Sequence, residues 1–197
     1  QPGPQDAVLV PSASIDGLYL HIPFCFHKCH YCDFFSVVDD SEDRQAAFTE
    51  QLIAELELRA SQVQLHPRTI FAGGGTPTLL RAELWQKILD TLHRLAVLER
   101  VEEFSVEANP ETVSAELLDL LVSCGVNRIS IGAQSFQPQL LKTLQRWHDP
   151  ARVVESVALA RTAGVRNLSL DLIFAIPQQS FVQLKADLQA ALALEPE

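Results

Sequence analysis

Short apolar strands alternate with longer helical stretches along most of this sequence, and that alternation limits the possible folds more than any other feature. Apolar residues at helical spacing follow each strand-like run, which gives about five such pairs. Consecutive pairs of this kind form a parallel sheet through right-handed crossovers. The sequence therefore predicts an α/β fold. The expected strands cover residues 17–23, 69–72, 103–107, 128–132 and 167–174. The expected helices cover residues 43–65, 81–96, 114–123, 137–145 and 151–162, with a last helix after residue 180.

Two segments of the chain are visibly alike and indicate a repeated unit. Residues 124–131 read CGVNRISI, and residues 163–170 read AGVRNLSL. Each has a glycine that ends a helix, a short polar link and a short apolar strand. Further along, Ser180 and Gln183 have the spacing of a capping box, which predicts the start of the last helix.

Composition and charge exclude several classes of protein. The chain has 197 residues, of which 47% are hydrophobic, so it can bury one core and is not disordered. Its 15 basic and 25 acidic residues give a net charge of −10, and no basic run is present, so we expect no nucleic-acid partner. No apolar stretch is long enough to span a membrane, and no basic flank marks a secretory signal.

The domain organisation follows from the same pattern. Residues 1–16 are rich in Pro, Ser, Gln and Gly and show no period, so we expect a mobile leader. Residues 17–197 are expected to form one domain. The sequence contains no methionine and stops directly after a helical pattern, which is typical of a piece of a longer protein.

Three cysteines, Cys25, Cys29 and Cys32, lie within eight residues directly after the first predicted strand. Their C-x3-C-x2-C spacing allows three thiolates to converge on one metal centre and leaves one coordination position open. Four cysteines in the whole chain are too few for a disulfide scaffold. The clustering therefore predicts metal chemistry, an iron-sulfur cluster in the first place, in a reducing compartment such as the cytoplasm.

Two alternatives remain open for this loop. A zinc ion would use the same three cysteines, with His27 or His30 as its fourth ligand. A redox dithiol is the other interpretation, although its usual spacing is C-x2-C.

Other conspicuous residues are interpreted as structural. Trp85, Trp147 and the phenylalanines are expected in the core or between helices. Cys124 lies at a helix end, far from the other cysteines in sequence, and is expected to be a buried, inert thiol.

Further polar clusters follow the ends of the later strands. Because a parallel sheet offers its ligand site at the carboxyl ends of its strands, we expect these clusters to meet the cysteine loop at one rim. Each also has a simpler interpretation, since a glycine run can be a tight turn and a carboxylate can be a satisfied acceptor. Arg146 can likewise be a solvated helix end. The clusters are 73–77 (GGGTP), 107–110 (EANP), 134–136 (QSF) and 171–177 (DLIFAIP).

The cysteine loop and the strand before it resemble the radical S-adenosylmethionine (SAM) superfamily. Residues 19–34 read YLHIPFCFHKCHYCDF, and the four later motifs follow in the same order, including 127–136 (NRISIGAQSF). Together they resemble the heme chaperones related to oxygen-independent coproporphyrinogen III oxidase. This resemblance runs from about Gly17 to Glu197.

The resemblance implies a partial parallel (βα) barrel of the radical SAM type. About five of its six βα units are present, and the chain would stop before the sixth strand and a C-terminal extension. In this family three cysteines hold a [4Fe-4S] cluster, and SAM chelates its fourth iron. An electron donor reduces the cluster. The implied cluster ligands are Cys25, Cys29 and Cys32. The implied SAM-site residues are Tyr19 and Tyr31 beside the cluster, Gly74, Gly75 and Thr76 at the amino-acid moiety, and Glu107, Gln134, Arg146 and Asp171.

Two functions are compatible with these motifs. The resemblance favours a cytoplasmic heme chaperone that passes heme to acceptor hemoproteins, with heme contacts outside this chain. The alternative is an oxidase that decarboxylates the propionates of coproporphyrinogen III. The oxidase has a further cysteine where this sequence has Phe34, which favours the chaperone. Relatives also show a Gly-Leu-Pro-Gly type of turn where this chain has residues 174–179 (FAIPQQ).

Overall fold

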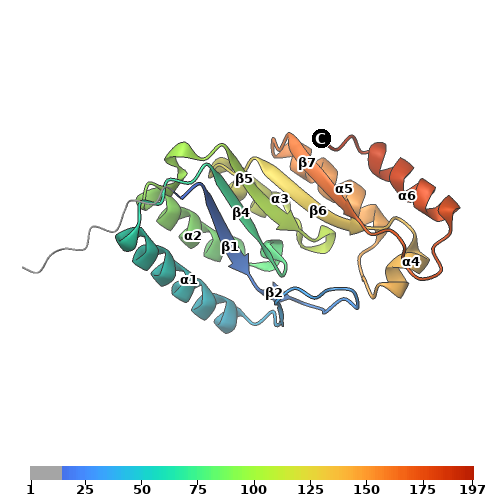
Figure 1. Ribbon diagram of the computed structural model, residues 1–197, viewed down its shortest axis with the longest axis horizontal. Coiled ribbons are helices and arrows are strands. Elements are labelled where there is room, and N and C mark those ends of the chain that lie inside the picture. The colour runs from blue at the N-terminus through green and yellow to red at the C-terminus, as the bar shows by residue number, and fades with distance from the viewer. Residues whose placement is uncertain (1–14) are drawn as a thin grey trace, which may run out of the picture.

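A five-stranded parallel sheet forms the centre of the protein in the computed structural model, which describes residues 15–197. The strands lie side by side in chain order (Figure 1). They are β1 (Gly17–Ile22), β4 (Thr69–Gly74), β5 (Glu103–Ala108), β6 (Arg128–Gln134) and β7 (Asn167–Leu172). The predicted α/β fold is confirmed. Most of the expected leader, residues 1–14, lies outside the described residues.

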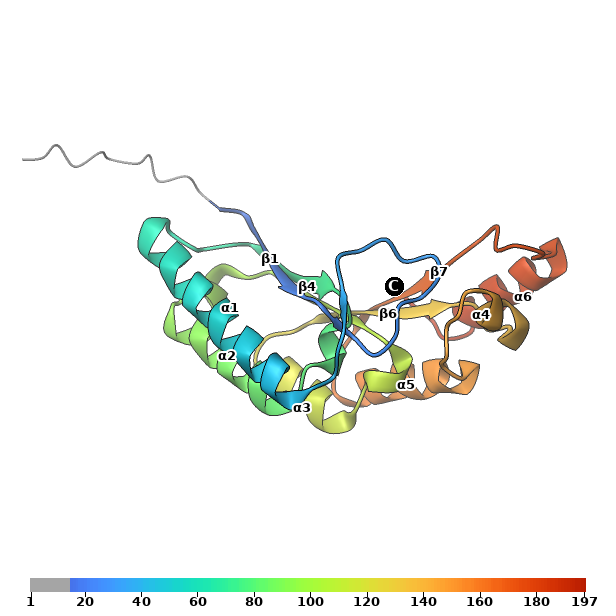
Figure 2. The same cartoon turned by 90° about the horizontal axis from the view of Figure 1, so that it is seen from below.

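Helices connect the strands and cover one face of the sheet. Figure 2 shows α1, α2, α3 and α5 on this face, while the segment between two short strands, β2 and β3, extends on the opposite side. The helices are α1 (Glu42–Gln62), α2 (Ala82–Arg94), α3 (Ala115–Ser123), α4 (Pro138–Thr143), α5 (Pro150–Thr162) and α6 (Phe181–Leu192). The short strands are β2 (Phe24–Cys25) and β3 (Val37–Val38), which pair in parallel. None of the helices between residues 15 and 197 combines the length and the apolar character needed to cross a membrane.

The alternation of side chains along each strand separates the core from the opposite face. Successive residues of a strand point to opposite sides, so one set packs against the helices. The buried set is Leu20, Ile22, Ile70, Ala72, Phe104, Val106, Ile129 and Ile131. The intervening positions are more polar and include Glu107, Ser130 and Asp171. The face that the helices leave uncovered therefore carries the polar side chains.

The sheet is open within the described part of the chain. Strands β1 and β7 stand at its two ends and do not pair with each other. The arrangement is consistent with the predicted partial barrel.

Trp85 of helix α2 is fully buried. It donates its Nε1–H to the carbonyl of Pro77 at 2.9 Å, as expected for a core residue.

The ends of several elements follow from local chemistry. Ser180 and Gln183 form the predicted capping box at the start of α6. Gly125 and Gly164 have φ values of 100° and 97°, which explains why both repeated segments need a glycine there. Helix α4 ends at Thr143, two residues before the prediction, because Gln145 has a left-handed backbone with φ 51°.

Candidate functional site

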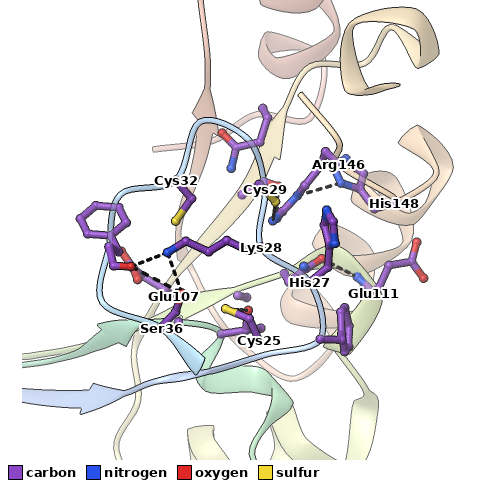
Figure 3. A pocket seen from close by; sticks show the side chains of 18 of the residues that line it. Cys25, His27, Lys28, Cys29, Cys32, Ser36, Glu107, Glu111, Arg146 and His148 are labelled. Atoms are coloured by element: carbon purple, nitrogen blue, oxygen red, sulfur yellow. Dashed lines mark hydrogen bonds between the residues drawn. The ribbon is translucent and has the colours of Figure 1, made fainter. Parts of the chain in front are cut away.

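The carboxyl ends of the strands and the cysteine loop enclose one pocket (Figure 3). Eleven of the twelve site residues expected from the sequence line this pocket. They are Cys25, Cys29, Tyr31, Cys32, Gly74, Gly75, Thr76, Glu107, Gln134, Arg146 and Asp171. The pocket therefore brings together the cysteine loop and the ends of β4, β5, β6 and β7.

Tyr19 is the one expected residue that the structure does not bring to this pocket. Its hydroxyl is hydrogen-bonded to Nδ1 of His21 at 3.0 Å, and its ring stacks on Phe71. It lines a separate cavity between β1 and α1. Burial raises the pKa of Tyr19, and the charge of Glu107 raises it further, so the phenol stays protonated at neutral pH.

The three loop cysteines are free and partly exposed. The Sγ of Cys25 lies 3.6 Å from Oγ1 of Thr76, and Nη1 of Arg146 lies 3.8 Å from the Sγ of Cys29. Tyr31 lies beside Cys29; burial raises the pKa of this tyrosine, against the opposing charge of Arg146. Each thiol is thus accessible from the pocket while its loop is held by neighbouring elements.

The donor set, three free thiols on one loop, fits an iron-sulfur cluster. A zinc ion needs all of its thiolate ligands at about 2.3 Å from one point. Across residues 15–197 no group of three His, Cys, Asp or Glu side chains is arranged to hold one metal ion. In an iron-sulfur cluster each thiolate binds a different iron, so the three sulfurs need not meet at one point. The alternative of zinc with His27 or His30 finds no support in this arrangement.

Lys28 stabilises the shape of the cysteine loop and was not identified from the sequence. Its Nζ donates hydrogen bonds to the carbonyl of Phe34 at 2.7 Å and to Oγ of Ser36 at 3.0 Å. Figure 3 shows its side chain crossing the space between the three thiols. These bonds connect the start of the loop to its end.

Glu107 links the ends of β5 and β4. Its Oε2 accepts a hydrogen bond from the backbone N–H of Gly74 at 3.2 Å. A Cβ at Gly73 would lie only 2.7 Å from this oxygen, so the glycine permits the close approach. Burial raises the pKa of Glu107 and the charge of Asp171 adds to the effect, whereas the Gly74 bond opposes it.

Asp171 is the second carboxylate of the pocket and lies at the end of β7. The hydroxyl of Ser130 donates to its two oxygens at 3.0 and 3.2 Å. Burial raises the pKa of Asp171, while the Ser130 bond and the charges of Arg128 and Arg146 oppose that change. The pocket thus has two acidic walls separated by strand β6.

Arg146 is oriented by three contacts. Its Nη2 donates to the carbonyl of Gly132 at 3.0 Å, its Nε donates to Nδ1 of His148 at 3.2 Å, and its Nη1 contacts the thiol of Cys29. His148 is buried, and burial together with the charge of Arg146 lowers its pKa to about 4. The imidazole is therefore neutral at pH 7 and accepts the bond. Sequence reasoning missed His148, although its position two residues after Arg146 was a usable signal.

Three residues that were expected to be packed or buried are more exposed than predicted. Trp147 was expected in the core or between helices, but its side chain is 74% exposed and its ring stacks on His27 with a centroid distance of 3.9 Å. It lies in the connection between α4 and α5. Phe34 is 71% exposed, because it belongs to the cysteine loop and not to a strand. Cys124 is partly exposed, since α3 ends at Ser123 and leaves it at the surface.

Comparison with known protein families identifies the superfamily to which this chain belongs. Residues 19–191 match the radical SAM superfamily, and the chain belongs to it. Members of this superfamily use a [4Fe-4S] cluster and SAM, as the sequence motifs implied.

The relatives that match this chain include proteins named as heme chaperones. The chain is 41% identical to the heme chaperone HemW of Bacillus subtilis over 91% of this chain and 48% of that protein. It is 39% identical to HemW of Escherichia coli, over 91% of this chain and 48% of that protein. The chain thus spans about half the length of the curated relatives it matches.

Solved structures show the same fold. Coproporphyrinogen III oxidase (HemN) from Escherichia coli, a radical SAM enzyme, superposes with a TM-score of 0.82 at 27% identity, over 92% of this chain and 42% of that chain. The radical SAM methyltransferase TsrM from Kitasatospora setae superposes with a TM-score of 0.68 at 17% identity, over 92% of this chain and 34% of that chain. The second likeness concerns the fold alone.

Proposed function

We propose that this chain is the [4Fe-4S] and SAM-binding part of a cytoplasmic heme chaperone that delivers heme to acceptor hemoproteins. The observation that carries the proposal is its identity of about 40% with proteins named heme chaperone HemW along 91% of its length. Identity with the oxidase HemN is lower, at 27%. Contacts to heme and to the acceptor belong, in this proposal, to parts of the protein outside this chain.

Cys25, Cys29 and Cys32 are the proposed cluster ligands. They are the three thiols of the pocket and come from one loop that Lys28 holds in shape. When bound and reduced by an electron donor, the cluster and SAM supply reductive cleavage of a carbon–sulfur bond. The protein's part is to orient SAM and to keep water away from it.

The remaining pocket residues have roles that match the polar groups of SAM. Glu107 and Asp171 offer carboxylate oxygens to amino and hydroxyl groups, and Arg146 offers a guanidinium to the carboxylate. Gln134 adds an amide from the end of β6. Gly74, Gly75 and Thr76 bring backbone close to the amino-acid moiety, and Tyr31 stands beside the cysteines.

Phe34 favours the chaperone over the oxidase. Its ring lines the pocket and is largely exposed, at the position where the resemblance gives the oxidase a further cysteine. A phenyl ring offers neither a thiolate ligand nor an exchangeable proton. The oxidase remains the second candidate, because the structural likeness to HemN is high.

Anaerobic reconstitution of the full-length protein with iron and sulfide tests both candidates. We expect Cys25→Ser, Cys29→Ser and Cys32→Ser each to abolish iron and sulfide incorporation, whereas Cys124→Ser retains it, because Cys124 does not line the pocket. We expect the wild-type protein to bind heme and to leave coproporphyrinogen III unchanged. Turnover of coproporphyrinogen III would instead identify the oxidase, and zinc without iron would remove the cluster from the proposal.

A further inference from the structure

Gln134 stands in a strained turn at the end of β6. Its φ is 61°, in the left-handed region that residues other than glycine rarely adopt. The N–H of Ser135 donates to the carbonyl of Ala133 at 2.7 Å, which closes a three-residue turn around Gln134. The pairing of β6 with β7 is also irregular between Ile131 and Gln134. A backbone of this kind persists only where the surrounding structure holds it.

The strain has a visible effect on the pocket. The side-chain amide of Gln134 reaches back over Gly132, where an added Cβ would lie 2.7 Å from Nε2 of Gln134 and 3.0 Å from Nη2 of Arg146. The turn therefore aims the Gln134 amide into the pocket, next to the Arg146 guanidinium. With an ordinary extended backbone at Gln134, the chain direction after β6 and the aim of this amide would both change.

Asp187, 53 residues further along the chain, holds this turn from helix α6. Its Oδ2 accepts a hydrogen bond from the hydroxyl of Ser135 at 2.7 Å, and its Oδ1 accepts one from the N–H of Phe136 at 2.8 Å. Nε2 of Gln137 also approaches Oδ1, at 3.4 Å. The Ser135 hydroxyl in turn accepts from the N–H of Gln137 at 3.0 Å.

Because Asp187 is buried, its carboxylate depends on the hydrogen-bond donors around it. Asp187 is 2% exposed and Ser135 is fully buried. No Lys, Arg or His forms an ion pair with Asp187 in the described part of the chain. A buried carboxylate without a cation is stabilised only by the donors around it, and here all of them come from residues 135–137.

We propose that Asp187 is a positioning residue that holds the left-handed turn at Gln134 and so aims the Gln134 amide at the ligand in the pocket. It touches no ligand itself and acts through Ser135 and Phe136. The inference rests on the proposed function only in taking SAM as that ligand. Helix α6 thereby becomes part of the pocket's construction, although Asp187 does not line the pocket.

A stability cycle in the full-length protein tests the turn without any ligand. Gln134→Gly relieves the left-handed strain, so we expect it to raise the Tm of the wild-type protein by about 2 °C. In Asp187→Asn the turn is no longer held, the strain is released, and the same glycine is expected to give no increase. Ser135→Ala serves as the second background if Asp187→Asn folds poorly. An equal increase in all backgrounds would show that the turn does not depend on Asp187, and would overturn the proposal.

A binding cycle then tests the aim of the amide. SAM dissociation constants are measured for the reconstituted wild-type protein, Gln134→Ala, Asp187→Asn and the double variant. We expect each single variant to weaken binding roughly fivefold, and the double variant to be no weaker than Gln134→Ala alone. If the losses of SAM affinity in the two single variants multiply in the double variant, Asp187 does not act through Gln134, and the proposal is contradicted.

Thr49→Val is the matched control. The Thr49 hydroxyl is fully buried and donates to the carbonyl of Gln45 within α1, away from the pocket. We expect this variant to lower the Tm while leaving the SAM dissociation constant unchanged. If the wild-type protein binds no SAM, the proposed function fails, and the stability cycle still decides whether Asp187 holds the turn.

Discussion

Nη1 of Arg146 lies 3.8 Å from the Sγ of Cys29, although 117 residues separate the two in sequence. The contact joins the connection between α4 and α5 to the cysteine loop, and the backbone N–H of His30 donates to the carbonyl of Leu144 at 3.3 Å beside it. One side chain thus connects the expected cluster ligands with the wall of the pocket.

Replacement of Arg146 by Gln removes a positive charge next to a proposed cluster ligand. A positive charge and a hydrogen-bond donor beside a ligand sulfur stabilise the reduced, more negative state of a cluster. We therefore expect the midpoint potential of the reconstituted protein to shift to more negative values by tens of millivolts. Redox titration followed by electron paramagnetic resonance measures the shift. Lys142→Gln, an equal charge change outside the pocket, is expected to leave the potential unchanged.

Removal of the Trp147 ring should loosen the cysteine loop. Trp147 stacks on His27 with an interplanar angle of 19°, and aromatic pairs of this kind contribute about 1 kcal/mol. In Trp147→Ala we expect amide hydrogen exchange across residues 26–34 to rise roughly threefold to tenfold. Trp147→Phe keeps a ring and should exchange close to the wild-type rate. Equal protection in both variants would show that the stack does not hold the loop.

Gly74 is expected to tolerate alanine much less well than Gly125. Both have positive φ values, 112° and 100°, but a Cβ at Gly74 would lie 2.5 Å from Cε1 of His21, whereas the space around Gly125 is open. We expect Gly125→Ala to cost about 1 kcal/mol of unfolding free energy, from the backbone alone. Gly74→Ala should cost more than about 2 kcal/mol, because overlap adds to the strain. Urea denaturation measures both, and equal costs would contradict the crowding at Gly74.

Two positions in the turn after β7 are expected to prefer glycine. Ala175 and Gln178 have φ values of 58° and 69°, at the two places where the sequence resemblance gives relatives glycine. The turn thus has a left-handed backbone at two residues that are not glycine, at the expense of local strain. We expect Ala175→Gly and Gln178→Gly each to raise the unfolding free energy by about 0.5–1 kcal/mol. A lower value in urea denaturation for both variants would show that the turn is not strained.

His148 should make the protein sensitive to acid. Its pKa in the folded protein is lowered to about 4 from an ordinary value of 6.5. Between these values the unfolded chain binds a proton that the folded chain does not, so stability is present above pH 6.5 and is lost as the pH falls toward 4.

His148→Asn removes this titration while its amide oxygen still accepts from Nε of Arg146. We expect the variant to lose about 2 kcal/mol less stability than the wild-type protein between pH 7 and pH 4. Urea denaturation at both pH values gives the difference.

The strands and the main helices were predictable because each buries a periodic set of apolar residues. Phe104 and Val106, for example, alternate with polar neighbours on β5 and are fully buried. The two-residue strands β2 and β3 were not predicted, since so short a pairing has no period and depends on contacts between distant residues. The gathering of the polar clusters at one pocket followed from parallel topology alone.

The supporting residues of the pocket were not predictable in the same way. A lone acidic residue such as Asp187 in a predicted helix is usually solvated, and only the docking of α6 on residues 135–137 buries it. Likewise nothing in the sequence around Trp147 indicates that its ring meets His27 and not the core. Contacts between segments this far apart are set by tertiary packing, which local patterns do not encode.

The strands of the sheet lie in the order in which a ribosome makes them. Each new strand can pair with the edge left by the one before it, so the pocket is built from one side to the other during synthesis. The cysteine loop emerges first, Arg146 follows it, and the Asp171 wall and the helix that carries Asp187 come after Arg146. Cys29 is therefore made 117 residues before Arg146, its neighbour across the pocket, so the order of synthesis separates the cysteine loop in time from the later walls of the pocket.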